Sequence, residues 1–134
     1  MGTIERKILV VDDEPDVVSY LTTFLEDEGF SVVSAQDGPD GIAKARAERP
    51  DLITLDITMP GMSGIEVLTV LRRDPELNPI PVIVITGVTS FKKQLSFRGV
   101  RPPEAFMQKP MDLELLMSNV EYLLEQSSLR STNE

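Results

Sequence analysis

The chain contains neither cysteine nor histidine. Without cysteine it can form no disulfide framework, no thiolate nucleophile and no metal site with cysteine ligands. Without histidine it lacks the side chain that most often acts as a general base near neutral pH, and it cannot itself carry phosphohistidine. Chemistry in this protein would therefore fall to carboxylates, hydroxyls, ammonium groups and the backbone.

Positive charge and long apolar runs are also scarce. The chain has 13 Lys and Arg against 22 Asp and Glu, a net charge of −9, which argues against nucleic acid as a direct ligand because phosphates bind to basic surfaces. No apolar run approaches the roughly 18 residues of a membrane span. The N-terminal residues lack the layout of a signal peptide. We therefore expect a cytoplasmic protein that contacts neither nucleic acid nor membrane.

Short apolar runs alternate with helical patterns along the 134 residues, a length that corresponds to one domain. Continuous apolar runs are typical of strands buried on both faces. The predicted strands are Ile8–Val11, Phe30–Ala35, Leu52–Leu55, Val82–Ile85 and Ala105–Met107. The predicted helices span residues 15–28, 41–48, 65–74, 90–97 and 112–125, with a turn at 37–39 and a frayed end from 126 onward. This alternation predicts an α/β, doubly wound parallel sheet with helices on both faces.

Polar residues stand at the carboxyl ends of four predicted strands. Asp12 and Asp13 follow the first strand, Asp56 follows the third, and Thr86 and Lys109 end the last two. Open parallel sheets bind ligands beyond the carboxyl ends of their strands, where the strand order reverses. We therefore expect these five side chains to gather in one site.

Three carboxylates in one place repel one another unless a cation lies between them. Oxygen ligands without histidine or cysteine suit Mg²⁺ or Mn²⁺. We expect Asp13 and Asp56 to be direct ligands, together with the backbone carbonyl of Thr58. Asp12 would act mainly through water.

A carboxylate oxygen can also attack phosphorus and form an aspartyl phosphate, which makes Asp56 a candidate nucleophile. In phosphoryl transfer the protein mainly positions the group and neutralises its equatorial oxygens. A metal ion would do this on one side and the Lys109 ammonium on another. The Thr86 hydroxyl and the Gly87 backbone N–H can each donate to a phosphoryl oxygen.

Four short motifs follow one another along the chain. They are VVDDE at Val10–Glu14, LDITMPGMSG at Leu55–Gly64, VITG at Val84–Gly87 and QKP at Gln108–Pro110. With them the chain resembles the receiver domain of bacterial two-component response regulators, in the chemotaxis-type single-domain architecture. The resemblance implies a flavodoxin-like five-stranded sheet of order 2-1-3-4-5. It also implies a signalling switch in which Asp56 accepts a phosphoryl group from a histidine kinase or a histidine phosphotransfer protein.

The resemblance further implies a role for each remaining site residue. Asp12 and Asp13 match the acidic metal-binding pair, Thr86 the switch hydroxyl, and Lys109 the lysine that pairs with phosphate. The peptide bond between Lys109 and Pro110 matches one that is cis in the family. Phe106 matches the switch aromatic, whose ring turns inward when Thr86 moves toward the phosphoryl group. As an alternative, Phe106 is fixed core filler.

The resemblance covers about residues 7–125. We therefore expect residues 1–125 to be the receiver domain and 126–134 a polar tail or the start of a linker. The helix after the fourth strand, the fifth strand and the last helix would bind a downstream protein. Residues 99–104 (GVRPPE) are longer and stiffer than the usual turn of the family. The last helix has four acidic residues up to position 125 and no Lys or Arg, which argues against basic–acidic dimer contacts. We expect a monomer or a weak homodimer.

The same residues allow two other functions. A Mg²⁺-dependent phosphatase with an aspartate nucleophile would also use a strand-end Asp, a hydroxyl and a lysine, but it needs a second Asp two positions later, where Thr58 stands. A flavin or nucleotide carrier would need a Gly/Ser/Thr phosphate cradle after the first strand, where this chain is acidic. A purely structural interpretation makes Asp12 and Asp13 helix caps. We favour the regulator, which assists only its own phosphotransfer and dephosphorylation.

Overall fold

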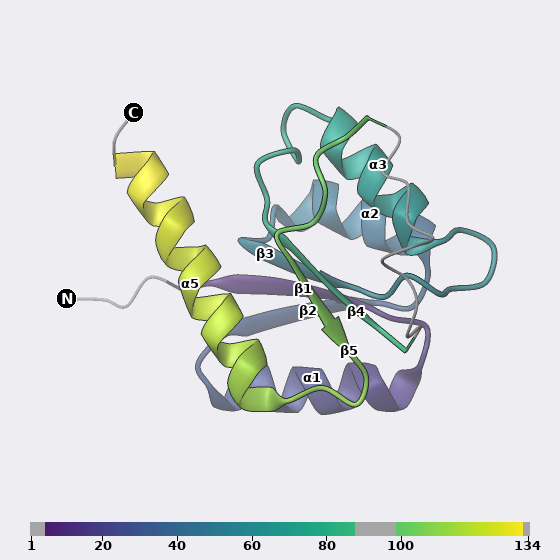
Figure 1. Ribbon diagram of the computed structural model, residues 1–134, viewed down its shortest axis with the longest axis horizontal. Coiled ribbons are helices and arrows are strands. Elements are labelled where there is room, and N and C mark those ends of the chain that lie inside the picture. Colours follow the sequence, from purple (N-terminus) through teal and green to yellow (C-terminus); the bar gives the residue numbers. More distant parts are fainter. Residues whose placement is uncertain (1–4, 88–98, 133–134) are drawn as a thin grey trace.

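The computed structural model describes residues 5–87 and 99–132 (Figure 1). The helix predicted at residues 90–97 falls in the segment 88–98 and therefore lies outside the described residues. Within the described residues, Figure 1 shows a central sheet with helices on both of its faces.

The sheet contains the five predicted strands at nearly their predicted positions. They are β1 (Lys7–Val11), β2 (Ser31–Ala35), β3 (Leu52–Leu55), β4 (Val82–Thr86) and β5 (Ala105–Gln108). All neighbours pair in parallel, in the order β2-β1-β3-β4-β5, which confirms the predicted topology. The strand order reverses between β1 and β3. A ligand crevice is therefore expected beyond their carboxyl ends.

Four helices cover the sheet in the part of the chain that the structure describes. They are α1 (Pro15–Asp27), α2 (Gly38–Glu48), α3 (Gly64–Arg73) and α5 (Leu113–Thr132). The helices α2 and α3 pack on one face of the sheet, and α1 and α5 on the other (Figure 1). None of the described helices is both long and apolar enough to cross a membrane.

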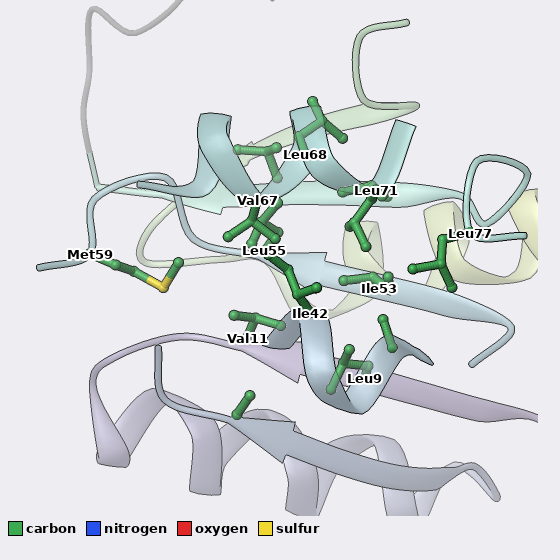
Figure 2. Close-up of a cluster of buried hydrophobic side chains, with 14 of the residues drawn as sticks. Leu9, Val11, Ile42, Ile53, Leu55, Met59, Val67, Leu68, Leu71 and Leu77 are labelled. Carbon is green, nitrogen blue, oxygen red and sulfur yellow. The ribbon is translucent and has the colours of Figure 1, made fainter. Parts of the chain in front are cut away.

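Each strand contributes to two cores because successive side chains point to opposite faces. In β1, Leu9 and Val11 face α2 and α3, whereas Ile8 and Val10 face α1 and α5. Figure 2 shows the first core, where Leu55 of β3 lies among the side chains of α3. Leu55 is fully buried, and burying a side chain of this size stabilises the fold by about 2 kcal/mol. The strands that lead to the site are therefore firmly held.

Helix α2 begins earlier than the sequence pattern predicts. Residues 37–39 were expected to form a turn, but α2 already starts at Gly38. The Asp37 side chain accepts a hydrogen bond of 2.8 Å from the backbone N–H of Asp40, as an N-cap residue does. Pro39 then stands in the first turn, where its missing N–H costs nothing. The prediction of a separate turn was therefore wrong.

Helix α5 extends beyond its predicted end. Instead of fraying from Gln126, it continues to Thr132. The guanidinium of Arg6, just before β1, donates a hydrogen bond to the Ser128 hydroxyl. This tertiary contact holds the polar end of the helix against the domain. Residues 126–132 are therefore helical, while their assignment as tail or linker stays a prediction.

Candidate functional site

The carboxyl ends of the central strands bring Asp12 and Asp56 together. Val11 pairs with Leu55 in the parallel ladder between β1 and β3, so the residues that follow them are neighbours. The ladder continues one step further, because the N–H of Asp56 donates to the carbonyl of Val11 at 3.0 Å. Asp12 and Asp56 are both almost completely buried, with 2% and 3% of their surface exposed. The backbone therefore holds two carboxylates side by side away from bulk water.

Asp13 completes an acidic cluster with these two residues. One carboxylate oxygen each from Asp12, Asp13 and Asp56 lie within 4.8 Å of one another. Asp13 is half-buried, whereas the other two are buried. Oxygen atoms at this spacing can contact one cation together. The structure thus brings together the three carboxylates that the sequence analysis expected to meet.

Lys109, which follows β5, places its ammonium group against this cluster. Its Nζ atom lies 2.9 Å from Oδ2 of Asp12 and 3.5 Å from Oδ2 of Asp56. The N–H of Lys109 donates to the carbonyl of Thr86 at 3.0 Å, which anchors the lysine beside the end of β4. Burial opposes the charge of Lys109, but the hydrogen bond to Asp12 and the charges of both carboxylates raise its pKa above the ordinary value. The lysine is therefore a cation throughout the physiological pH range.

The pKa of Asp56 reflects this crowded environment. Burial, together with the charges of Asp12 and Asp13, raises the pKa of Asp56 to about 6. The Lys109 ammonium and the Thr58 backbone N–H, which donates to Oδ1 at 3.3 Å, act in the opposite direction. Asp56 is therefore mostly ionised at neutral pH. It has an excess of negative neighbours that a bound cation would relieve.

Asp56 opens into a cavity of about 300 Å³ at the rim of the sheet. The cavity is lined by Asp13, Glu14, Asp56, Thr58, Gly87 and Lys109. A cavity of this volume has room for a small anionic group and water beside the carboxylate. Five of these lining residues were predicted site residues; Glu14 was not.

Glu14 is a residue that the sequence analysis missed. Its Oε1 atom lies 3.7 Å from Nζ of Lys109, although 60% of its side chain is exposed. Its position directly after Asp12 and Asp13 was the available signal, but a lone exposed glutamate at the start of a helix is usually explained by the helix dipole. In the fold it is a third carboxylate near the same lysine.

Thr86 and Phe106, the two predicted switch residues, lie on the neighbouring strands β4 and β5. Thr86 is the last residue of β4 and is fully buried. Phe106 in β5 is half-buried and packs against the core on the α2 and α3 side. The peptide bond between Lys109 and Pro110 is cis. The packing of Phe106 is compatible with either the switch role or the core role considered above.

Gly64, at the start of α3, allows the chain to pass close to Asp56. A Cβ atom at this position would lie 2.2 Å from the carbonyl oxygen of Asp56, well inside van der Waals contact. The N–H of Gly64 donates to the carbonyl of Ile57 at 2.8 Å. The loop between β3 and α3 is thereby closed tightly behind Asp56. Only glycine fits at this position, and the sequence pattern did not reveal this steric requirement.

Comparisons with known proteins agree with this geometry. The sequence matches the response regulator receiver domain family over residues 8–121. It is 38% identical to Protein PilH of Pseudomonas aeruginosa, over 88% of this chain and 97% of that protein. It is 35% identical to the alkaline phosphatase synthesis transcriptional regulatory protein PhoP of Bacillus subtilis, over 94% of this chain but only 51% of that protein.

A solved structure supports the same assignment. The CheY-like response regulator receiver domain protein of Methanospirillum hungatei superimposes with a TM-score of 0.85. It is 26% identical, and the match covers 94% of this chain and 98% of that one. The resemblance inferred from the four motifs is thereby confirmed, and the phosphatase alternative is not favoured. The chain belongs to the response regulator receiver domain family, whose function is phosphorylation-dependent two-component signalling.

Proposed function

We propose that Asp56 is the phosphoacceptor of this receiver domain. The observation that carries the proposal is its position: a buried carboxylate that opens into a cavity and has the Lys109 ammonium 3.5 Å away. No other aspartate among the described residues combines burial, an adjoining cavity, two neighbouring carboxylates and a lysine.

The proposed reaction is a transfer of one phosphoryl group from nitrogen to oxygen. A carboxylate oxygen of Asp56 attacks phosphorus of a phosphohistidine on a kinase or phosphotransfer protein. The P–N bond breaks, a P–O bond forms, and the electron pair stays on the imidazole nitrogen, which takes up a proton. Because its pKa is about 6, Asp56 is ionised and nucleophilic at neutral pH. Lys109 is placed to neutralise an oxygen of the arriving group.

A divalent cation fits the acidic cluster, and we propose Mg²⁺, with Mn²⁺ as a substitute. Asp13 and Asp56 would be direct ligands with the Thr58 carbonyl, and Asp12 would act through water. The fit rests on three carboxylate oxygens within 4.8 Å of one another, without nitrogen or sulfur ligands. When bound, the ion would supply positive charge opposite Lys109 for the phosphoryl oxygens.

The output would be a shift between two populations of the domain rather than catalysis of an external reaction. A phosphoryl group adds about −1.5 to −2 charge, which would draw the Thr86 hydroxyl and the Gly87 N–H toward it and move the Phe106 ring. The proposed downstream surface includes β5 and α5, whereas its third part lies within 88–98, outside the described residues. On α5, Leu115 and Tyr122 are 52% and 61% exposed, which supports a protein contact there. We place this activity in the cytoplasm.

Intact mass spectrometry after incubation with a small phosphodonor and Mg²⁺ tests the acceptor. Wild type should gain one phosphate, and Asp56→Asn should gain none. Asp27→Asn is the matched control because Asp27 is an exposed aspartate at the end of α1. A phosphate retained by Asp56→Asn would place the acceptor elsewhere. No adduct on folded wild type would overturn the proposed phosphorylation.

Thermal unfolding tests the cation site separately. Ligands that bind only the folded state raise the midpoint of unfolding, so millimolar Mg²⁺ should raise the Tm of wild type. The Tm of Asp13→Asn should respond weakly or not at all, and that of Asp27→Asn should respond as wild type. Equal responses of all three proteins would show that the ion binds outside the acidic cluster.

A further inference from the structure

Arg72, near the end of α3, is a buried cation far from the acidic cluster. Only 1% of its side chain is exposed, and arginine is rarely buried without partners. A guanidinium carries five N–H groups. In this fold they meet five acceptors: the backbone carbonyls of Asn78, Ile80, Arg101 and Pro102, and the carboxylate of Glu104. Every donor of Arg72 therefore has a partner.

These partners come from two loops that are separate in sequence. Asn78 and Ile80 lie between α3 and β4, while Arg101, Pro102 and Glu104 precede β5. The second loop is the stretch whose length and stiffness depart from the usual family pattern. Pro102 and Pro103 have no N–H and cannot anchor it by donating to neighbours. Arg72 instead binds the loop by donating hydrogen bonds to the loop's backbone carbonyls.

Glu104 carries the contact from Arg72 to the start of β5. Its Oε1 atom lies 2.7 Å from Nη2 of Arg72 and also accepts a hydrogen bond of 2.7 Å from the N–H of Val82. In return, the N–H of Glu104 donates to the carbonyl of Val82 at 2.9 Å. Hydrogen bonds from Val82 and Arg72 outweigh the effect of burial and lower the pKa of Glu104. The start of β5 is thus joined to both β4 and α3.

The opposite end of β5 leads directly to Lys109. β5 is an edge strand of four residues, Ala105–Gln108, that pairs only with β4 in the described sheet. Its backbone is fixed at one end by Glu104 and Val82 and at the other by the hydrogen bond from Lys109 to Thr86. Between these two ends β5 pairs residue by residue with β4, from Ala105 with Ile83 to Gln108 with Thr86. The strand therefore links Glu104 at its start to Lys109 at its end through one short stretch of backbone.

We propose that Arg72 is a positioning residue: acting through Glu104 and β5, it holds the Lys109 ammonium at Asp12 and Asp56. Loss of the guanidinium would leave the Glu104 carboxylate with less positive charge beside it. The carbonyls of Arg101 and Pro102 would lose their hydrogen-bond donor. The start of β5 would then become free to shift, and Lys109 with it. The kinetic part of this inference rests on the proposed phosphorylation of Asp56; the placement of Lys109 does not.

The first test is nuclear magnetic resonance of the unphosphorylated protein. Arg72→Met should shift the backbone amide of Lys109 and the resonance of its side-chain ammonium. Arg73→Met is the matched control because Arg73 is the exposed neighbour on the same helix; it should leave both resonances unchanged. Unchanged Lys109 resonances in a folded Arg72→Met protein would overturn the proposal.

The second test separates positioning from general stability. With a small phosphodonor, Arg72→Met should lower the phosphorylation rate of the otherwise wild-type protein about tenfold, as a displaced catalytic cation would. In a Lys109→Ala background the same change should alter the rate less than about twofold, because the group that it positions is absent. Equal losses in both backgrounds would overturn the proposal in favour of a structural role.

A conservative pair of variants covers the case in which Arg72→Met does not fold. Glu104→Gln keeps the size of the side chain and should shift the Lys109 resonances in the same direction, whereas Glu76→Gln, in the loop after α3, should not. If wild type forms no adduct, the proposed function fails, but the resonances of Lys109 still decide this inference. If wild type is phosphorylated and neither Arg72 nor Glu104 variants affect Lys109, only this inference fails.

Discussion

The ammonium group of Lys109 lies closer to Asp12 than to Asp56, at 2.9 Å against 3.5 Å. The lysine therefore already has a carboxylate partner before any phosphate arrives. A cation at the acidic cluster would compete with the Lys109 ammonium for the carboxylates. A phosphoryl group on Asp56 would compete with the carboxylates for the ammonium. Lys109 is thus shared between two carboxylates rather than paired with Asp56 alone.

Replacing this lysine should change how Asp56 titrates. The Lys109 ammonium lowers the pKa of Asp56, so in Lys109→Ala that pKa should rise above about 6 in cation-free protein. Titration of the ¹³C carboxyl resonance of Asp56 measures it, with Lys44→Ala on α2 as a control that should titrate as wild type. An unchanged or lower pKa in Lys109→Ala would contradict the arrangement described for the site.

The same pKa predicts how stability depends on pH. The pKa of Asp56 is about 6 in the folded protein against an ordinary value of 3.8, so the folded state binds this proton more tightly. Its contribution to stability is present below about pH 3.8 and is lost as pH rises through about 6. This difference between the folded and the ordinary pKa corresponds to on the order of 3 kcal/mol in the free energy of unfolding.

Asp56→Asn should therefore stabilise the cation-free protein at pH 8 and have a much smaller effect at pH 4. Urea denaturation with a chelator at both pH values measures the free energies of unfolding. Asp27→Asn, which changes an exposed aspartate, should have little effect at either pH. If Asp56→Asn were no more stable than wild type at pH 8, the buried and ionised carboxylate would not destabilise the folded protein as we infer.

Gly64 gives a steric prediction. In Gly64→Ala the new Cβ would lie 2.2 Å from the Asp56 carbonyl oxygen, so the loop must shift, at a cost of about 2 kcal/mol or more. Gly87→Ala is the comparison, because a Cβ there meets no atom of the described residues within 4 Å. The midpoints of urea unfolding should separate the two variants clearly. Equal midpoints would mean that the loop behind Asp56 is less constrained than its geometry indicates.

The end of α5 tests the predicted domain boundary. Deleting residues 126–134 removes Ser128, the acceptor for Arg6, but keeps Leu124, the last buried side chain among the residues of α5 whose burial is described. We expect a cooperative unfolding transition with a loss of about 1 kcal/mol, the usual contribution of a hydrogen bond. Arg6→Ala in the full chain should cost a similar amount. A non-cooperative transition would place the end of the domain beyond residue 125.

Several features followed from local sequence alone. The runs at Ile8–Val11 and Leu52–Leu55 are apolar without interruption, and such short runs are typical of strands that are buried on both faces. With the alternation of strands and helices, they determined a parallel sheet whose carboxyl edge carries Asp12, Asp56 and Lys109. The four motifs then identified the family. Local order and spacing were sufficient because the backbone ladder itself brings strand ends together.

Other features depend on tertiary contacts that no local pattern contains. The pattern of α3 gives no sign that Arg72 is buried, because its acceptors lie in two loops that only the folded chain brings together. The extended end of α5 contacts Arg6, which is more than 100 residues away in sequence. Glycine is needed at position 64 because the Asp56 carbonyl approaches it closely. The sequence therefore determined the fold and the chemical groups of the site. Only the tertiary structure decided which partner each group has, because burial and distance between remote segments are properties of the packed chain.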